Sequence, residues 1–273
     1  MKPSFFELTY FETYYFANII NNLLRDPFSY LRSLNEFFGD ENYKRFLDPF
    51  PKQSRFHDFI YHVIDSITYE DINDQEIELF RSRKRQLWIE IALDHFGFTY
   101  EKFDDWISQH DKTQEELTDD EIFEYLNELK YAGTYEDLLD RMSEEIFFIL
   151  FLNRQVLQNF NQMAAHQIED VTIDSLEPEE YIYFQKDGVL KRVSIPMWVQ
   201  RAVLFRDRGM CVSCNKDLSG ILSIGSIENF DHIVPLSKGG MNDITNIQLL
   251  CESCNKSKQG QSIDTSIKYE KWY

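Results

Sequence analysis

The chain of 273 residues lacks any long hydrophobic run. A membrane-spanning helix needs about 20 consecutive apolar residues, whereas the longest aliphatic and aromatic run, IFFILFL, occupies only residues 146–152. The N-terminal stretch MKPSFFELTYFE places acids and a proline where a secretory signal peptide has an unbroken apolar segment. We therefore expect a soluble cytoplasmic protein with no membrane partner.

Cysteine is scarce and confined to one region of the chain. Its four residues, Cys211, Cys214, Cys251 and Cys254, form two Cys-x-x-Cys pairs. In an intracellular protein this spacing favours metal binding over a disulfide framework. Two such thiolate pairs complete a tetrahedral four-cysteine site for Zn²⁺. The sequence thus predicts structural zinc, which by itself does not specify a function, since nucleases, transcription factors and scaffolds all use such sites.

Positive charge is also in short supply, with 28 Lys and Arg against 47 Asp and Glu and a formal net charge of −19. The deficit is uneven: residues 191–273 hold 11 basic and 8 acidic residues, or +3, so residues 1–190 carry −22. Neutralisation of phosphates supplies most non-specific affinity for DNA, which disfavours direct DNA binding by the front part. The end of the chain tolerates phosphate, because salt screens each field within about 8 Å.

The front part has the apolar spacing of successive amphipathic helices. Gly39, Gly97 and Gly133 mark helix ends, and Thr118 with Glu121 forms a capping box. The expected helices lie within residues 16–26, 28–40, 55–67, 75–97, 119–133 and 135–169. The histidines of this part lack matching partners, and we interpret them as ordinary helix residues: His57, His62, His95, His110 and His166.

An acidic segment, IEDVTIDSLEPEE at residues 168–180, interrupts the helical pattern. Beyond it, YIYFQKDGVLKRVSI alternates, with Asp187 and Gly188 at the expected hairpin turn, and Pro196 opens a short basic helix. We therefore predict a mainly helical chain. Its parts are an acidic all-helical domain over residues 1–170, a linker over 171–180, and a small α+β zinc domain over 181–273.

The segment between the two cysteine pairs carries groups suited to phosphodiester hydrolysis. Such a reaction needs a general base, oxygen ligands for a hard cation and cationic groups for the remaining charge. His232, with an ordinary pKa of ~6.5, is the candidate base, and Asp231 precedes it. If CESCNKSK begins a helix, then Asn255 and Lys258 share one stripe with the cysteines of that segment.

These residues resemble the HNH endonucleases, whose active site is a ββα-metal fold. The resemblance lies in RDRGMCVSC and FDHIVPLSKGGMNDITNIQLLCESCNKSKQ and covers about the last quarter of the chain. It implies that Asp231 and Asn255 ligate the catalytic metal, that His232 is the general base and that Asn246 positions the imidazole. It also implies that the cysteines hold structural zinc.

Many HNH members have histidine at the position of Asn255. An amide oxygen beside a carboxylate is a hard ligand set, so we expect dependence on Mg²⁺ or Mn²⁺ and no activity with Zn²⁺ alone. From charge alone, we also expect contacts to nucleic acid from basic side chains of this region: Arg206, Arg208, Lys238, Lys256 and Lys258.

The resemblance implies a metal-dependent endonuclease that nicks or cuts DNA, and it leaves RNA open as a substrate. The acidic helical part suggests a protein partner or self-association, in the manner of an effector of bacterial anti-phage defence. The alternative is a non-catalytic zinc-ribbon adaptor that binds nucleic acid or protein. Asp231, His232 and Asn255 together favour the nuclease, because an adaptor has no need of them.

Overall fold

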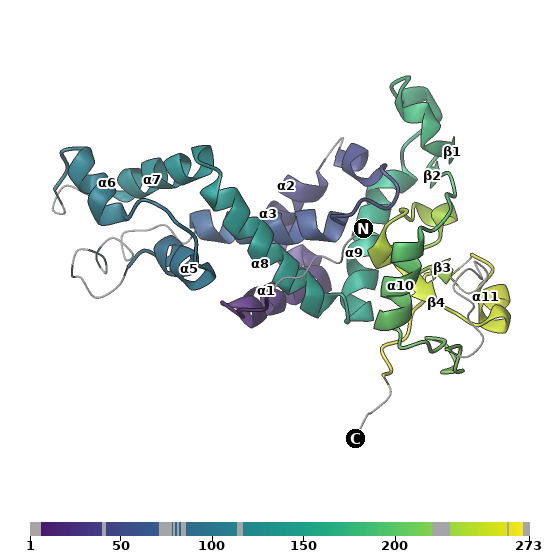
Figure 1. The fold of residues 1–273 in the computed structure, drawn as a ribbon. Coiled ribbons are helices and arrows are strands. Elements are labelled where there is room, and N and C mark those ends of the chain that lie inside the picture. The colour runs from purple at the N-terminus through teal and green to yellow at the C-terminus, as the bar shows by residue number, and fades with distance from the viewer. Residues whose placement is uncertain are drawn as a thin grey trace. The chain divides into compact units, whose positions relative to one another are not determined.

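The computed structural model describes residues 7–39, 42–70, 78, 80, 82, 86–113, 117–219, 230–260 and 262–269 (Figure 1). It is mainly helical, with a small α+β region near the C-terminus, as the sequence predicted. The chain forms two compact units: the first comprises residues 1–18 and 60–146, and the second comprises residues 19–59 and 147–273. The predicted linker and zinc domain therefore lie in the same unit as several helices of the front part.

The first unit is built from helices around an aromatic core. Its helices are α5 (Trp88–Phe96), α6 (Phe103–Gln109) and α7 (Asp119–Tyr131), together with parts of α1 (Thr13–Arg25), α3 (Arg55–Glu70) and α8 (Thr134–Leu150). Phe103, Trp106 and Tyr125 are fully buried and contact one another. The sequence did not predict α6, a helix too short for a clear apolar period.

Two predicted helix boundaries of this unit are confirmed. The backbone N–H and the hydroxyl of Thr118 both donate to Glu121 Oε2 at 2.7 Å, which forms the capping box at the start of α7. Gly97 ends α5 in the left-handed conformation at φ 74°, which glycine adopts without steric cost. The single helix predicted over residues 75–97 is wrong, because Gln86 and Leu87 are not helical and α5 begins only at Trp88. Most of residues 71–85 lie outside the described residues.

A buried carboxylate fixes the N-terminal segment of the first unit. Glu145 on α8 is fully buried and accepts hydrogen bonds from the backbone N–H groups of Thr9 and Tyr10 at 2.7 and 3.0 Å. The hydroxyl groups of Thr9 and Thr13 donate to the same carboxylate. These four donors replace the hydrogen bonds to water that the carboxylate loses when it is buried.

The second unit packs helices and 3-10 turns around the α+β region. Its elements before the α+β region are η1 (Pro27–Tyr30), α2 (Leu31–Phe38), η2 (Asn42–Phe46), α9 (Arg154–Glu169), η3 (Ile173–Ser175), η4 (Glu180–Ile182), β1 (Phe184–Lys186), β2 (Val189–Leu190) and α10 (Met197–Arg206). Phe38, Phe56 and Phe59 surround Phe160 of α9 with ring centroids 4.9–6.0 Å away. This aromatic cluster makes the early helices part of the core on which the C-terminal region is built.

The single helix predicted over residues 135–169 is wrong, because the chain forms two helices there. α8 ends at Leu150, and α9 begins at Arg154. Between them the side chain of Asn153 accepts hydrogen bonds from the backbone N–H groups of Gln155 and Val156, as an N-cap does. The apolar spacing continues across this break, so hydrophobic periodicity alone does not predict it.

The predicted linker is an ordered part of the second unit. Residues 171–180 include η3 and the start of η4, and Glu180 is buried. The Glu180 carboxylate accepts from Tyr43 at 2.8 Å and pairs with Lys44 at 3.0 Å. The hairpin beyond it is confirmed, with β1 and β2 antiparallel and Gly188 at φ 62°.

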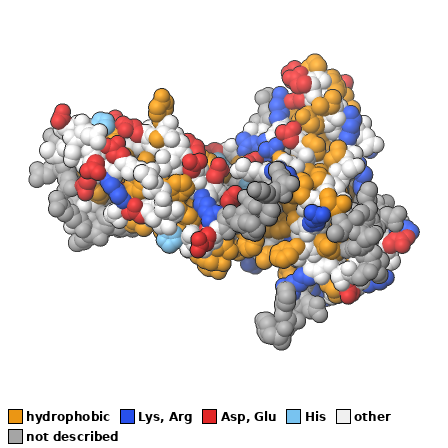
Figure 2. Space-filling view, in the orientation of Figure 1, with side chains coloured by type: hydrophobic (Ala, Val, Ile, Leu, Met, Phe, Trp, Pro, Cys, Tyr) orange, Lys and Arg blue, Asp and Glu red, His pale blue; other side chains and the backbone are white. Residues whose placement is uncertain are grey.

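The negative charge of the chain is concentrated in the first unit. Its residues include 26 Asp and Glu against 9 Lys and Arg, a charge of −17, which leaves 21 against 19, or −2, for the second unit. In Figure 2 acidic side chains recur over the first unit, where exposed acids on α6 and α7 include Asp104, Asp105, Asp119 and Asp120. Among the described residues, no helix is long and apolar enough to cross a bilayer.

Candidate active site and four-cysteine cluster

The candidate site lies on a short β-hairpin followed by a helix (Figure 1). Strands β3 (Phe230–His232) and β4 (Ile247–Leu249) are antiparallel, with Asp231 opposite Gln248 and His232 opposite Ile247. Helix α11 (Glu252–Lys258) follows β4. Two strands, a connecting segment and a helix form a ββα arrangement, in which the successive residues Asp231 and His232 point to opposite faces of the strand.

His232 is buried and electrically neutral at neutral pH. Its side chain is enclosed, and burial together with the positive charge of Arg192 lowers its pKa to about 4. Nε2 of the imidazole lies 3.3 Å from the side-chain oxygen of Asn242. Because the amide nitrogen of Asn242 donates to the backbone oxygen of Lys191 at 3.0 Å, its oxygen faces the imidazole. Nε2 therefore carries the proton, which leaves Nδ1 able to accept one.

The segment that carries Asn242 is held by the helical part of the same unit. The backbone N–H of Phe50 donates to the backbone oxygen of Asn242 at 2.7 Å. The neighbouring Asp243 is fully buried and accepts from the backbone N–H of Arg55 at 3.1 Å, where α3 begins. Burial raises the pKa of Asp243, while hydrogen bonds from Thr245 oppose that shift. Segments distant in sequence thus fix the position of Asn242, the hydrogen-bond partner of His232.

Asn246 anchors the connecting segment and lies beside the backbone rather than the imidazole. Its oxygen accepts from the Val234 N–H at 2.8 Å, and its amide donates to the backbone oxygens of Val234 and Met241 at 3.0 and 2.8 Å. Gly239, at φ 72°, lets this segment approach α9, since a Cβ there would collide with the backbone oxygen of Ala165. The histidine contact that the sequence assigned to Asn246 is made by Asn242, which the sequence did not single out.

Lys258 joins helix α11 to strand β3. Its ammonium group lies 2.7 Å from Asp231 Oδ2 and also donates to the backbone oxygens of His232 and Ile233. The Lys258 and Asp231 side chains are only 6% and 12% exposed. Lys258 is therefore an internal partner of Asp231, rather than an open contact for nucleic acid.

Asn255 lies on the same helix, one turn before Lys258. Its backbone N–H donates to the oxygen of Cys251, which is the N-cap residue of α11. The spacing places Asn255, Cys251 and Lys258 along one stripe, as predicted. Lys258 holds this stripe against β3 through Asp231. The Asp231 carboxylate and the Asn255 amide are the hard oxygen donors expected for a divalent cation, and their binding of one stays a prediction.

The four cysteines form one cluster. The sulfur atoms of Cys211, Cys214, Cys251 and Cys254 all lie within 4.8 Å of one another, and those of Cys214 and Cys251 are 3.7 Å apart. A tetrahedral site with Zn–S bonds of about 2.3 Å places its sulfurs roughly 3.8 Å apart. The cluster therefore fits Zn²⁺, as the sequence predicted, and it ties the turn before β3 to the start of α11.

Arg206 was expected to contact nucleic acid, but it lies in the core of the second unit. Its side chain is fully buried, where it pairs with Asp207 through two hydrogen bonds of 2.9 Å and donates to the backbone oxygen of Ile247. Asp207 also accepts from the N–H of Leu249 at 2.9 Å and lies 3.5 Å from Arg154. Arg206 thus supports strand β4 and has no surface to offer to phosphate.

The other basic residues expected to contact nucleic acid are exposed. Arg208, with φ 57°, follows α10, and Lys238 ends the 3-10 turn η6 (Leu236–Lys238). Lys256 on α11 pairs with Glu252 one turn earlier, and its side chain is 75% exposed. These three side chains remain accessible to a charged ligand, and their contacts to nucleic acid stay a prediction.

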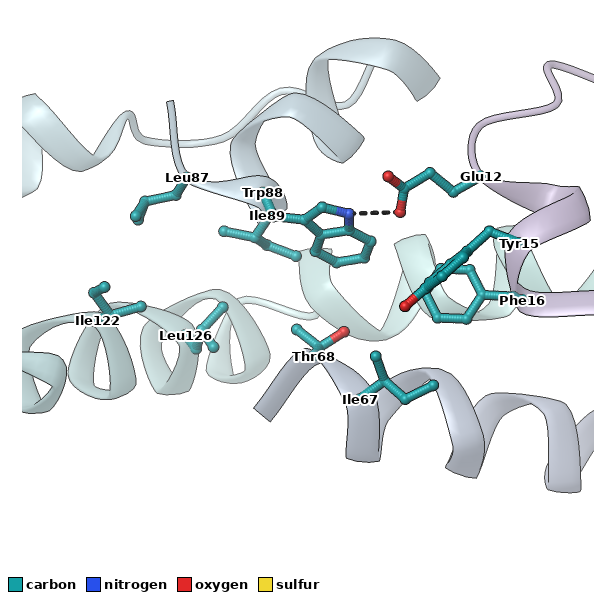
Figure 3. A pocket seen from close by; sticks show the side chains of 10 residues that line it. All are labelled: Glu12, Tyr15, Phe16, Ile67, Thr68, Leu87, Trp88, Ile89, Ile122 and Leu126. Carbon is teal, nitrogen blue, oxygen red and sulfur yellow. Dashed lines mark hydrogen bonds between the residues drawn. The ribbon is translucent and has the colours of Figure 1, made fainter. Parts of the chain in front are cut away.

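A separate pocket in the first unit offers little chemistry. Figure 3 shows Trp88 donating to the Glu12 carboxylate at 2.8 Å, among apolar side chains from α1, α3, α5 and α7. The hydroxyl of Thr68 is turned to the backbone oxygen of Ile64. The one carboxylate of the lining is thus already bonded, and the pocket provides packing rather than a reactive group.

The four-cysteine cluster and the ββα arrangement lie within one segment of the chain. Residues 211–261 match the family described as HNH endonuclease. No curated protein and no solved structure matches the chain. The chain therefore contains an HNH endonuclease domain with a four-cysteine cluster, and domains of this family are typically phosphodiester hydrolases acting on DNA.

Proposed function

We propose that the protein is a metal-dependent endonuclease that hydrolyses phosphodiester bonds of DNA. The observation that carries this proposal is the state of His232: a buried, neutral imidazole whose Nε2 is bonded to Asn242, directly after Asp231. A neutral imidazole that carries its proton on Nε2 can accept a second proton at Nδ1.

In this reaction His232 removes a proton from the attacking water through Nδ1. Asn242 keeps the proton on Nε2 and holds the ring in one orientation. Asp231 and Asn255 would hold Mg²⁺ or Mn²⁺, and such an ion supplies charge stabilisation for the pentacoordinate phosphate and the leaving oxygen. Asn246 fixes the connecting segment, so that His232 and Asp231 keep their relation.

A plasmid-nicking assay tests this proposal. The zinc-loaded full chain is expected to nick supercoiled DNA with Mg²⁺ or Mn²⁺, whereas His232→Ala is expected to lose about three orders of magnitude in rate, since general bases contribute roughly 10²–10⁴-fold. Asp231→Asn should also lose activity. Equal behaviour of wild type and His232→Ala would favour the zinc-ribbon adaptor, and robust cleavage with Zn²⁺ alone would contradict the assignment of a hard metal.

We further propose that the protein acts as an effector of bacterial anti-phage defence, with the acidic first unit as its protein-binding or self-associating part. The support is the charge of −17 on that unit, which suits a protein contact better than a DNA contact. Plating efficiency of phages on cells producing wild type or His232→Ala tests this role. Equal plating on both strains would contradict it.

A further inference from the structure

A polar cavity adjoins the candidate active site in the second unit. It has a volume of about 460 Å³, within the range of small-molecule pockets. Its walls are the turn at residues 212–213, β4, α11 and the C-terminal segment of residues 262–268, and they include Gln248, Lys258, Asp264, Thr265 and Lys268. The segment 262–268 lies beyond the residues that match the HNH family, so this chain adds one wall of the cavity to the common domain.

Two polar atoms of the cavity wall have unmet hydrogen-bonding capacity. Gln248 is only 1% exposed, and its amide nitrogen donates to the backbone oxygen of Asp264 at 2.9 Å. Its Oε1 is buried and has no hydrogen-bond partner among the described residues, and the same is true of the Thr265 hydroxyl oxygen. Such groups cost free energy when buried without a partner. Both atoms belong to residues that line one cavity, so a ligand bound there would complete their bonds.

Two residues that line the cavity are neighbours of Asp231, the candidate metal ligand. Gln248 on β4 is paired with Asp231 on β3, so their side chains lie on the same face of the hairpin. Lys258 lines the cavity and also bonds Asp231 at 2.7 Å. A molecule in the cavity would therefore lie beside the position where the scissile phosphate is expected.

We propose that this cavity binds one nucleotide of the DNA substrate next to the cleaved bond, with Gln248 and Thr265 contacting the base. The proposal rests on the proposed nuclease function and adds to it a subsite for substrate recognition. Gln248 Oε1 accepts an N–H group, which the amino and imino groups of nucleobases provide, and the Thr265 hydroxyl donates or accepts. An ionised phosphate has no such donor, so the base rather than the phosphate faces these atoms.

The charges around the cavity agree with a nucleotide. The ionisable side chains of its lining, apart from the zinc-site Cys254, are Lys258, Lys268 and Asp264, which sum to one positive charge. The backbone oxygen of Lys268 accepts from Arg154, which anchors this end of the segment to α9. Because Lys258 is paired with Asp231, the phosphate of a nucleotide is attracted to the Lys268 side of the cavity.

Two variants test the subsite through binding, independently of cleavage. Thr265→Val removes a hydroxyl that has no protein partner at its oxygen among the described residues, so it should leave stability unchanged or raise it. Gln248→Met removes the unpaired oxygen together with one bond to a backbone oxygen. Gln200→Met is the matched control, because Gln200 is also buried, donates to the backbone oxygen of Ile195 and has an unpaired Oε1, but lies outside the cavity.

The experiment uses the zinc-loaded full chain carrying His232→Ala, a fluorescent DNA duplex and the four deoxynucleoside 5′-monophosphates as probes. Thr265→Val and Gln248→Met should each weaken duplex binding about ten-fold, the effect of one lost hydrogen bond. Ligand-observed NMR should show a monophosphate bound to the parent chain and lost in Thr265→Val. Gln200→Met should leave duplex and monophosphate binding unchanged.

Other outcomes overturn the proposal in separable ways. If the wild type cleaves DNA but neither cavity variant alters binding of the duplex or of any monophosphate, the subsite is wrong and the nuclease assignment stands. If the cavity variants change only the unfolding temperature, the cavity is a solvent-filled gap under the C-terminal segment. If the chain binds a monophosphate through Thr265 but never cleaves DNA, the subsite stands and the proposed nuclease function fails.

Discussion

The side-chain oxygen of Asn242 lies 3.3 Å from Nε2 of His232, and the amide nitrogen of the same Asn242 donates to Lys191. This pair sets which imidazole nitrogen is protonated. Asn242 is held in turn by the backbone N–H of Phe50, from a part of the chain almost two hundred residues earlier. The orientation of the candidate base thus depends on packing between the helical part of the second unit and the HNH domain.

Replacing Asn242 and Asn246 by alanine should have different effects. Asn242→Ala is expected to fold and to reduce the nicking rate about 10- to 100-fold, because the imidazole loses its fixed orientation. Asn246→Ala leaves buried backbone groups of Val234 and Met241 without partners, so it should cost about 2–3 kcal/mol in the free energy of unfolding. Urea denaturation and single-turnover nicking measure the two effects. A comparable loss of stability in both variants would contradict the separate roles.

Lys258 should stabilise the protein through Asp231. Lys258→Met leaves a nearly buried carboxylate and two backbone oxygens without their cation, and we expect a loss of about 3 kcal/mol in unfolding free energy. Lys256→Met removes a lysine from the same helix whose pair with Glu252 is exposed, so its cost should stay below about 0.5 kcal/mol. Urea denaturation of both variants checks this, and equal stabilities would refute the internal role of Lys258.

Removal of zinc should unfold the HNH domain. The four-cysteine cluster joins the turn at Cys211 and Cys214 to the start of α11, and structural Zn²⁺ bound there would contribute directly to folding, as it does in small domains. Elemental analysis should find zinc in the purified chain, and Cys251→Ser should abolish it. Chelation should then increase proteolysis of residues 230–260 while the first unit stays resistant. Full activity and resistance after verified zinc loss would contradict a structural role.

His57 should make stability depend on pH. Its ring stacks on that of Phe147 with the ring centroids 3.6 Å apart, and Ser54 forms a hydrogen bond with Nδ1. Burial lowers the pKa of His57 from 6.5 to about 4. The unfolded state then binds more protons between these values, so stability is fully present above pH 6.5 and falls as the pH drops towards 4.

The free energy of unfolding that His57 removes between pH 6.5 and pH 4 amounts to at most about 3 kcal/mol. His57→Phe keeps the stacking partner and should flatten the pH dependence of the unfolding free energy between pH 6.5 and 4. His166→Phe, at a side chain that is 69% exposed, is the control. An unchanged slope in His57→Phe would show that the half-buried imidazole does not govern this dependence.

A fragment of residues 181–273 should not fold by itself, even with zinc. It lacks Arg154, which pairs with Asp207, and Asn161, which donates to Thr245 at 3.2 Å. It also lacks the backbone donors of Phe50 and Arg55 that fix residues 242–243. Cooperative unfolding of this fragment, measured by circular dichroism, would show that the HNH domain is autonomous and that these contacts are dispensable.

The helices of the chain were predictable where local signals mark them. The capping box at Thr118 and Glu121 and the glycine at 97 are local features, and both occur as expected. The break at Asn153 was missed because the apolar period runs through it. Arg206 was predicted from its charge to contact nucleic acid, but it is buried and bonded to Asp207 and to the backbone oxygen of Ile247, and the contact with Ile247 depends on long-range packing.

The sequence by itself determined the residue types of the C-terminal region: two cysteine pairs at zinc spacing, and Asp231, His232 and Asn255 within the segment that matches the HNH family. These features are local patterns of residue type and distance along the chain. The tertiary structure decided which groups surround them. It placed Asn242 rather than Asn246 on the imidazole and Lys258 on Asp231, and it brought residues 262–268 over Gln248. Such contacts join segments that no periodicity relates, because they depend on how the whole second unit buries its core.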